Sequence, residues 1–121
     1  MKRARLEEQM RTISVQFQPR RAEGFKTDRV CELMLHVALD SDVKTFSVEW
    51  SRARNSYVNF LFSSPTPKRT WRVLQQIALR HRVFGGRMRR STMVTCQGTR
   101  GWHNYRLLHH FATDTKLDRL T

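Results

Sequence analysis

The chain has 121 residues, which allows one domain with a modest hydrophobic core, and its composition is strongly basic. Twenty-three Lys and Arg stand against ten Asp and Glu, a formal net charge of +13, and eighteen of the basic residues are Arg. The length excludes a second domain, the two cysteines exclude a disulfide framework, and no apolar run approaches the roughly 18 residues of a membrane span. The basic start lacks the apolar region of a secretory signal, so the sequence predicts a soluble intracellular protein.

The first third of the chain predicts a strand followed by a helix. Apolar residues alternate with polar ones from Ile13 to Phe17, which is typical of a half-buried strand, and Pro19 ends it. An amphipathic helix is predicted over residues 28–39, with Thr27 or Asp28 as its N-cap. The apolar stripe of this helix consists of Val30, Leu33, Met34 and Val37.

The middle of the chain predicts a hairpin and a second helix. Apolar residues alternate again in the segments 46–50 and 58–62, and the polar turn between them favours an antiparallel hairpin. Thr66 can cap a helix and Pro67 suits its first turn, so a helix is predicted from there to about residue 82. Its buried stripe is predicted to contain Trp71, Leu74 and Ala78.

The last third is less regular. The glycine pair Gly85-Gly86 is predicted to end the second helix, and the basic link 87–90 then leads to a fourth strand over residues 93–96. The segment 102–111 is aromatic and basic, and its periodicity fits a strand or a helix equally well.

This order of elements predicts an α+β domain in which two helices pack on a mainly antiparallel four-stranded sheet. A ferredoxin-like and a thioredoxin-like strand order use nearly the same elements, so both stay open. Residues 1–97 are assigned to this domain and residues 98–121 to a basic and aromatic C-terminal extension. The extension is expected to become ordered on contact with RNA or a neighbouring subunit. Cys31 and Cys96 are interpreted as small buried hydrophobic residues.

Positive charge is concentrated in the second half of the chain. Residues 64–121 carry a net charge of +10, whereas residues 1–63 carry +3. Between Glu49 and Asp114, 64 consecutive residues contain no carboxylate. Cations without local counter-ions indicate a polyanionic partner. The predominance of Arg, whose guanidinium is bidentate to phosphate, favours a nucleic acid over a membrane surface.

The predicted RNA-binding residues come from this carboxylate-free stretch. They are Arg52, Arg54, Lys68, Arg69, Arg72, Arg80, Arg82, Arg87, Arg89, Arg90, Arg100, Trp102, His103 and Arg106. Near the end of the list, aromatic side chains alternate with basic ones, which is typical of surfaces that bind single-stranded or looped RNA. The alternative for Trp102, Tyr105, Leu108 and Phe111 is that they pack on the domain.

Motifs for catalysis are absent. The chain contains no dinucleotide-binding glycine motif, no P-loop and no zinc-protease motif. The histidines His103, His109 and His110 lie close together in sequence, but no Asp, Glu or Cys stands at the spacing that would complete a metal site. A nucleophilic pair of Cys96 with His81 or with His103 is better explained by coincidence. The sequence therefore predicts no enzymatic activity, no cofactor, no metal and no small-molecule substrate.

Three parts of the chain together resemble a known family. They are the segment Ile13-Ser14-Val15-Gln16-Phe17-Gln18-Pro19, the helix that follows it, and the hairpin strand Tyr57-Val58-Asn59-Phe60-Leu61-Phe62. This family is the mitochondrion-specific large-subunit ribosomal protein fifty-three, and the resemblance covers roughly residues 12–63. It implies a structural protein of the mitochondrial ribosome in the matrix, with a thioredoxin-like fold and with ribosomal RNA and neighbouring ribosomal proteins as partners. Residues 87–121 have no counterpart in it.

A second function stays open. A small inhibitor or immunity-type protein that binds an acidic protein partner through the same basic surface would have a similar size and order of elements.

Overall fold

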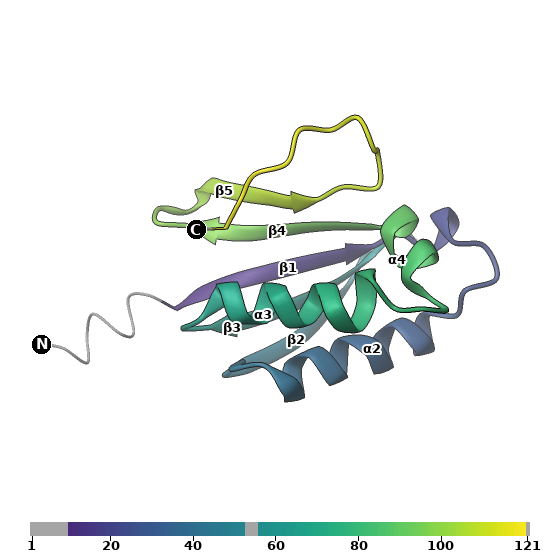
Figure 1. Cartoon of the computed structure of the whole chain (residues 1–121), viewed down its shortest axis with the longest axis horizontal. Coiled ribbons are helices and arrows are strands. Elements are labelled where there is room, and N and C mark those ends of the chain that lie inside the picture. Colours follow the sequence, from purple (N-terminus) through teal and green to yellow (C-terminus); the bar gives the residue numbers. More distant parts are fainter. Residues whose placement is uncertain (1–9, 53–55, 121) are drawn as a thin grey trace, which may run out of the picture.

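The computed structural model describes residues 10–52 and 56–120. Five strands form one antiparallel sheet in the order β2-β3-β1-β4-β5 (Figure 1). The strands are β1 (Arg11–Phe17), β2 (Thr45–Trp50), β3 (Val58–Ser64), β4 (Thr92–Gly98) and β5 (Gly101–His109). The α-helices are α2 (Thr27–Asp40), α3 (Pro67–Leu74) and α4 (Gly85–Ser91). The predicted α+β class is confirmed, whereas the predicted four strands and two helices become five and three within the described residues.

Apart from the short helix α4, which precedes β4, the elements from β1 to β4 follow the order β-α-β-β-α-β, and β1 lies between β3 and β4 with both pairings antiparallel. This is the split β-α-β arrangement, the ferredoxin-like one of the two predicted strand orders. The helices α2 and α3 lie on the same face of the sheet (Figure 1). No described helix covers the opposite face, which we call the helix-free face.

The core forms between this sheet and the helices because the central strands alternate in burial. In β1, the side chains of Ile13, Val15 and Phe17 are fully buried, and the residues between them point to the helix-free face. The strands β3 and β4 alternate in the same way. The predicted helix stripe Val30, Leu33, Met34 and Val37 is buried against them, which confirms that part of the prediction.

The second predicted helix ends earlier than expected, and a third helix follows it. The helix α3 continues as a short π-helix, η2 (Gln75–Leu79), and the glycine pair begins α4 instead of ending α3. Gly85 is needed for a close approach, because a Cβ there would lie 2.8 Å from the carbonyl O of Leu79. The basic link predicted at 87–90 is therefore helical.

The undecided segment 102–111 forms most of β5, which pairs with β4 at the sheet edge. Leu108 is buried in the common core, and the ring Nε2 of His109 donates to the carbonyl O of Arg89 at 2.9 Å. The chain then returns past β5, where Asp118 N donates to Leu107 O at 2.7 Å. The predicted division into a domain of residues 1–97 and an extension of residues 98–121 stays a prediction. The strand β5, which belongs to the predicted extension, lies in the same sheet as the four other strands.

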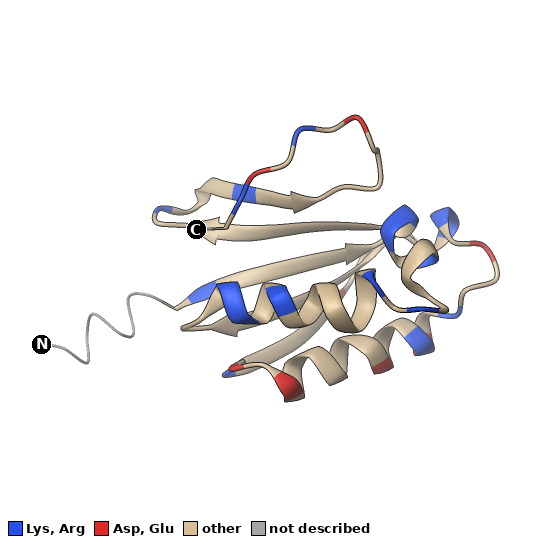
Figure 2. Ribbon diagram, in the orientation of Figure 1, with Lys and Arg blue, Asp and Glu red and all other residues tan. Residues whose placement is uncertain are grey.

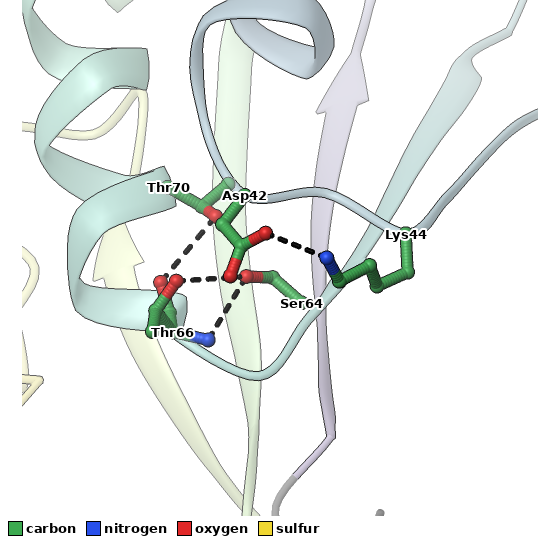
Figure 3. A network of polar contacts seen from close by, with 5 residues as sticks. All are labelled: Asp42, Lys44, Ser64, Thr66 and Thr70. Carbon is green, nitrogen blue, oxygen red and sulfur yellow. Dashed lines mark hydrogen bonds and ion pairs between the residues drawn. The ribbon is translucent and has the colours of Figure 1, made fainter.

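A polar network fixes the start of α3 at the opposite end of this helix from α4 (Figure 3). Thr66 N donates to Ser64 Oγ at 3.0 Å, and Thr66 O accepts from Thr70 N at 3.2 Å. Beside them, Lys44 Nζ and Asp42 Oδ1 form an ion pair of 2.9 Å. The hydrogen bond from Lys44 holds the pKa of the Asp42 carboxyl below its usual value, and Arg69 adds to this effect.

Candidate nucleic-acid interface

The strand order brings two basic segments together that are far apart in the sequence. Phe17, the last residue of β1, pairs with Thr92, the first residue of β4. The 3-10 helix η1 (Pro19–Arg21) follows β1 directly and α4 precedes β4 directly, so η1 and α4 meet at one end of the sheet. Gln18 N donates to Ser91 O at 2.8 Å across this junction.

Basic residues from four segments gather at this end of the molecule (Figure 2). We call it the basic end, and all of its cationic side chains are exposed. They are Arg20, Arg21, Lys26, Arg29, Arg80, Arg82, Arg87, Arg89 and Arg90. An open hollow of about 800 Å³ lies beside these cations and is lined by Pro19, Arg20 and residues 22–27.

Few carboxylates balance this charge. Glu23 and Asp28 lie in the same region, and Glu32 pairs with Arg29 at 3.2 Å. Within residues 10–52 and 56–120, that pair and the Asp42–Lys44 pair are the ion pairs that form. The cations of α4 and of the segment 80–82 therefore face solvent without a described counter-ion. Exposed like charges that are held close together make the binding of a polyanion more favourable.

A stack of aromatic rings underlies the basic end. Phe25 stacks on Phe84 with ring centroids 5.3 Å apart, and Phe84 stacks on His81 at 4.7 Å. The guanidinium of Arg87 lies 5.9 Å from the Phe25 ring, and that of Arg29 lies 6.0 Å from the Phe84 ring. These contacts hold the cationic side chains over apolar surface and reduce the conformational entropy lost on binding.

Arg89 has a structural role besides its charge. Its Nη1 donates to the carbonyl O of Leu79 at the end of η2, while its own carbonyl accepts from His109. It therefore links η2, α4 and β5. Substitution of Arg89 is expected to disturb packing as well as charge.

Other predicted cations lie away from the basic end. Lys68, Arg69 and Arg72 are exposed on α3, and Arg52 is exposed in the turn after β2. Arg54 lies outside the described residues. The predicted RNA-binding residues therefore lie on several surfaces. Of these, the cations between residues 80 and 90 lie at the basic end.

The predicted aromatic segment lies on β5 and opens onto the helix-free face. Trp102 is 44% exposed and Tyr105 is 51% exposed. Both line a hollow of about 420 Å³, together with Met93, Thr95, Leu107, His110 and Thr115. Trp102 also borders a second hollow of about 430 Å³, which Thr12, Ser14, Glu49, Asn59, Leu61 and Thr95 line. Trp102 therefore lines both hollows on the helix-free face of the sheet.

The remaining predicted residues lie on β5 or in the turn before it. Arg100 lies in the turn before β5, and His103 and Arg106 are exposed on β5. Arg106 pairs with the buried residue Cys96, which places it on the helix-covered side of the sheet. Phe111, by contrast, packs on the domain, because the Arg21 guanidinium lies 3.5 Å from its ring centroid.

The two thiols differ in burial in the part of the chain that the structure describes. Cys96 is buried, as predicted, and Cys31 is half-buried. No group of three or more His, Cys, Asp and Glu among the described residues could hold a metal ion. Within the same residues, no helix is long and apolar enough to cross a membrane.

The sequence analysis missed the four cations that precede or begin α2. These cations are Arg20, Arg21, Lys26 and Arg29. They lie in the half of the chain where carboxylates are frequent, so the search for a segment without carboxylates did not select them. The adjacent pair Arg20-Arg21 at the end of the first strand was the available signal. Its importance depends on the pairing of β1 with β4.

Comparison of the chain with protein-family models, curated proteins and solved structures found no match.

Proposed function

We propose that this protein is a structural RNA-binding protein, in which the basic end contacts phosphates and the helix-free face stacks unpaired bases. The observation that carries the proposal is the cluster of exposed cations at the basic end, which has few carboxylates beside it. Phosphate contacts supply most of the affinity in such complexes. Exposed Trp102 and Tyr105 offer the stacking surfaces that single-stranded RNA uses.

We further propose that the RNA is ribosomal, in the large subunit of the mitochondrial ribosome, with neighbouring ribosomal proteins as additional contacts. The resemblance of residues 12–63 supports this part of the proposal. The strand order adds no support, because the resemblance implies a thioredoxin-like fold. Sedimentation of cell extract on a gradient tests it: the protein should travel with the large ribosomal subunit, and its absence from those fractions contradicts the ribosomal assignment.

The role of the basic end is tested with two triple variants of equal charge change. Arg82→Ser, Arg87→Ser and Arg90→Ser together should weaken binding of a short single-stranded RNA and reduce the salt slope of log affinity by about 2 to 3, since each lost phosphate contact removes roughly one unit. The control carries Lys68→Ser, Arg69→Ser and Arg72→Ser on α3 and should lose less affinity. Equal losses would mean that net charge, and not the basic end, holds the RNA.

Base stacking is tested separately from phosphate binding. Trp102→Ala and Tyr105→Ala should each weaken binding of the RNA about 5- to 150-fold, corresponding to roughly 1–3 kcal/mol per stacked base. Binding of an abasic oligonucleotide of the same length should not change. Tyr57→Ala, at another exposed aromatic residue, is the control. If the protein instead binds one acidic protein tightly and RNA not at all, the inhibitor alternative is correct.

A further inference from the structure

The strand β2 is an edge strand that nothing in the described structure covers. It pairs with β3 on one side only, and five of its six residues are exposed. On the helix-covered side of the sheet, Val48 is 37% exposed and Trp50 is 64% exposed. An edge strand leaves a row of backbone N–H and C=O groups available for pairing with another strand.

The other edge of the sheet is protected, whereas β2 is not. At β5, Asp118 occupies the edge, because its N–H donates to Leu107 O at 2.7 Å and its carboxylate accepts from Leu107 N at 2.8 Å. Free edges are usually blocked by Lys, Pro, a bulge or a covering segment. The β2 sequence TFSVEW contains no Lys or Pro, its one charged residue is Glu49 on the helix-free face, and its register with β3 runs without a shift.

We propose that β2 pairs with β2 of a second copy of this chain to form a symmetric dimer. In an antiparallel pair, residues directly opposite each other lie on the same face of the sheet. Two-fold symmetry centred on Val48 therefore sets Val48 against Val48 of the second copy. The same register sets Phe46 of each copy against Trp50 of the other. All three positions lie on the side where Phe46 already packs against the core, so the apolar side chains cover one another.

The distribution of charge favours contact at this edge. Residues 31–50 contain four carboxylates and one Lys, in a chain whose net charge is +13. Just outside the strand, the register sets Arg52 of one copy opposite Lys44 of the other, and Asp42 balances Lys44 through its ion pair of 2.9 Å. Two copies therefore approach through a segment of the chain that carries a net negative charge.

The Trp50 end of β2 lies at the same end of the sheet as the basic end, because Trp50 pairs with Val58 and Val58 pairs with Phe17. In the sheet, β3 separates β2 from β1 and β4, the two strands next to η1 and α4.

The dimer would place two helix-free faces on the same side of one continuous sheet. This follows because a two-fold axis that relates residues on the same face runs perpendicular to the sheet. The inference concerns self-association and does not depend on RNA as the partner of the protein.

Light scattering with size-exclusion chromatography of the nuclease-treated full chain tests the dimer. At 1 M salt, where the Debye length is about 3 Å, we expect twice the chain mass of 14.4 kDa. Val48→Lys and Trp50→Lys should each give the monomer mass with an unchanged circular dichroism spectrum. Leu39→Lys, the same type of change at a residue that is 72% exposed on α2, should stay dimeric. A monomeric wild-type chain, or a dimer that survives both β2 changes, overturns the proposal.

The register is tested by crosslinking. Under oxidation, Val48→Cys should form an intermolecular disulfide, because directly opposite residues have Cβ atoms about 4.5–5.5 Å apart, close to disulfide geometry. Ser47→Cys should not, because the proposed register sets Ser47 opposite Glu49 of the second copy. Crosslinking of the Ser47→Cys chain, or none in the Val48→Cys chain, contradicts this register.

Discussion

The thiol of Cys96 lies on the helix-covered side of β4 and has no exposure to solvent. Burial raises its pKa to about 11, although the charge of Arg11 opposes this shift. Since the thiolate is the reactive form, the folded protein should not be alkylated at Cys96 at pH 8. Mass spectrometry after iodoacetamide treatment measures this, and labelling should occur in denaturant. Alkylation of Cys96 in the folded chain would contradict the buried position.

His109 gives the fold a dependence on pH. Burial lowers the pKa of its ring below the usual value, and the nearby charges of His110 and Arg89 lower it further. The unfolded chain therefore binds more protons than the folded chain in the window below the usual histidine pKa. Folding stability should consequently decrease as the pH falls from about 7 towards 5.

His109→Gln should reduce this dependence, because an amide does not titrate and can still donate to Arg89 O. Urea unfolding at several pH values measures the effect. His103→Gln, at an exposed position of the same strand, is the control and should keep the wild-type profile. Equal profiles for wild type and His109→Gln would show that other groups determine the acid sensitivity.

At the scale of elements, β5 connects the C-terminal segment to the core of the sheet. It was assigned to an extension, but its residue Leu108 is buried in the core shared with β4, and Leu120 packs on the same core. At the β4–β5 turn, a Cβ on Gly98 would overlap the backbone O of Asn104, so this turn accepts only glycine without rearrangement. The strand is therefore integrated into the sheet by packing and by backbone geometry.

Truncation tests whether residues 1–97 fold alone. A chain that ends at Gln97 should be less stable than the full chain by about 3 kcal/mol or more, because it loses Leu108 and uncovers Val94 and Cys96. Urea midpoints measure the difference. A chain that ends at His110 keeps β5 and should lose less. An unchanged midpoint for the shorter chain would support the division at residue 97 that the sequence predicted.

At the scale of the molecule, exposed cations gather at one end of the sheet. The basic end joins η1, the start of α2, the segment 80–82 and α4, where few carboxylates lie. A smaller exposed group, Lys68, Arg69 and Arg72, lies on α3, and the Asp42–Lys44 ion pair lies beside the start of that helix. This distribution favours the approach of a polyanion to the basic end.

The affinity of the wild-type chain for single-stranded RNA should fall with salt. If about six cations contact phosphates, log affinity against log salt should have a slope of about −4 or steeper, because each contact releases condensed counter-ion. Fluorescence anisotropy with a labelled oligonucleotide measures the slope between roughly 50 and 200 mM salt. A flat dependence would contradict the phosphate contacts on which the proposed function rests.

The sequence by itself determined the regular elements and the chemical character of the surface. The alternating residues of β1, β3 and β4 and the apolar stripe of α2 were predictable, since burial on one face imposes a period of 2 or 3.6 residues. The excess of Arg and the long segment without carboxylates could also be identified from the sequence, because they are properties of composition and folding does not change them.

The tertiary structure decided what periodicity and composition leave open. The segment 102–111 fits a strand or a helix, and only its pairing with β4 made most of it β5. Gly85 begins a helix because Leu79 approaches it closely, which no local signal reports. The basic end exists because β1 pairs with β4 and so joins η1 to α4. Contacts between residues more than 70 positions apart depend on strand order, and strand order is set by packing of the whole chain.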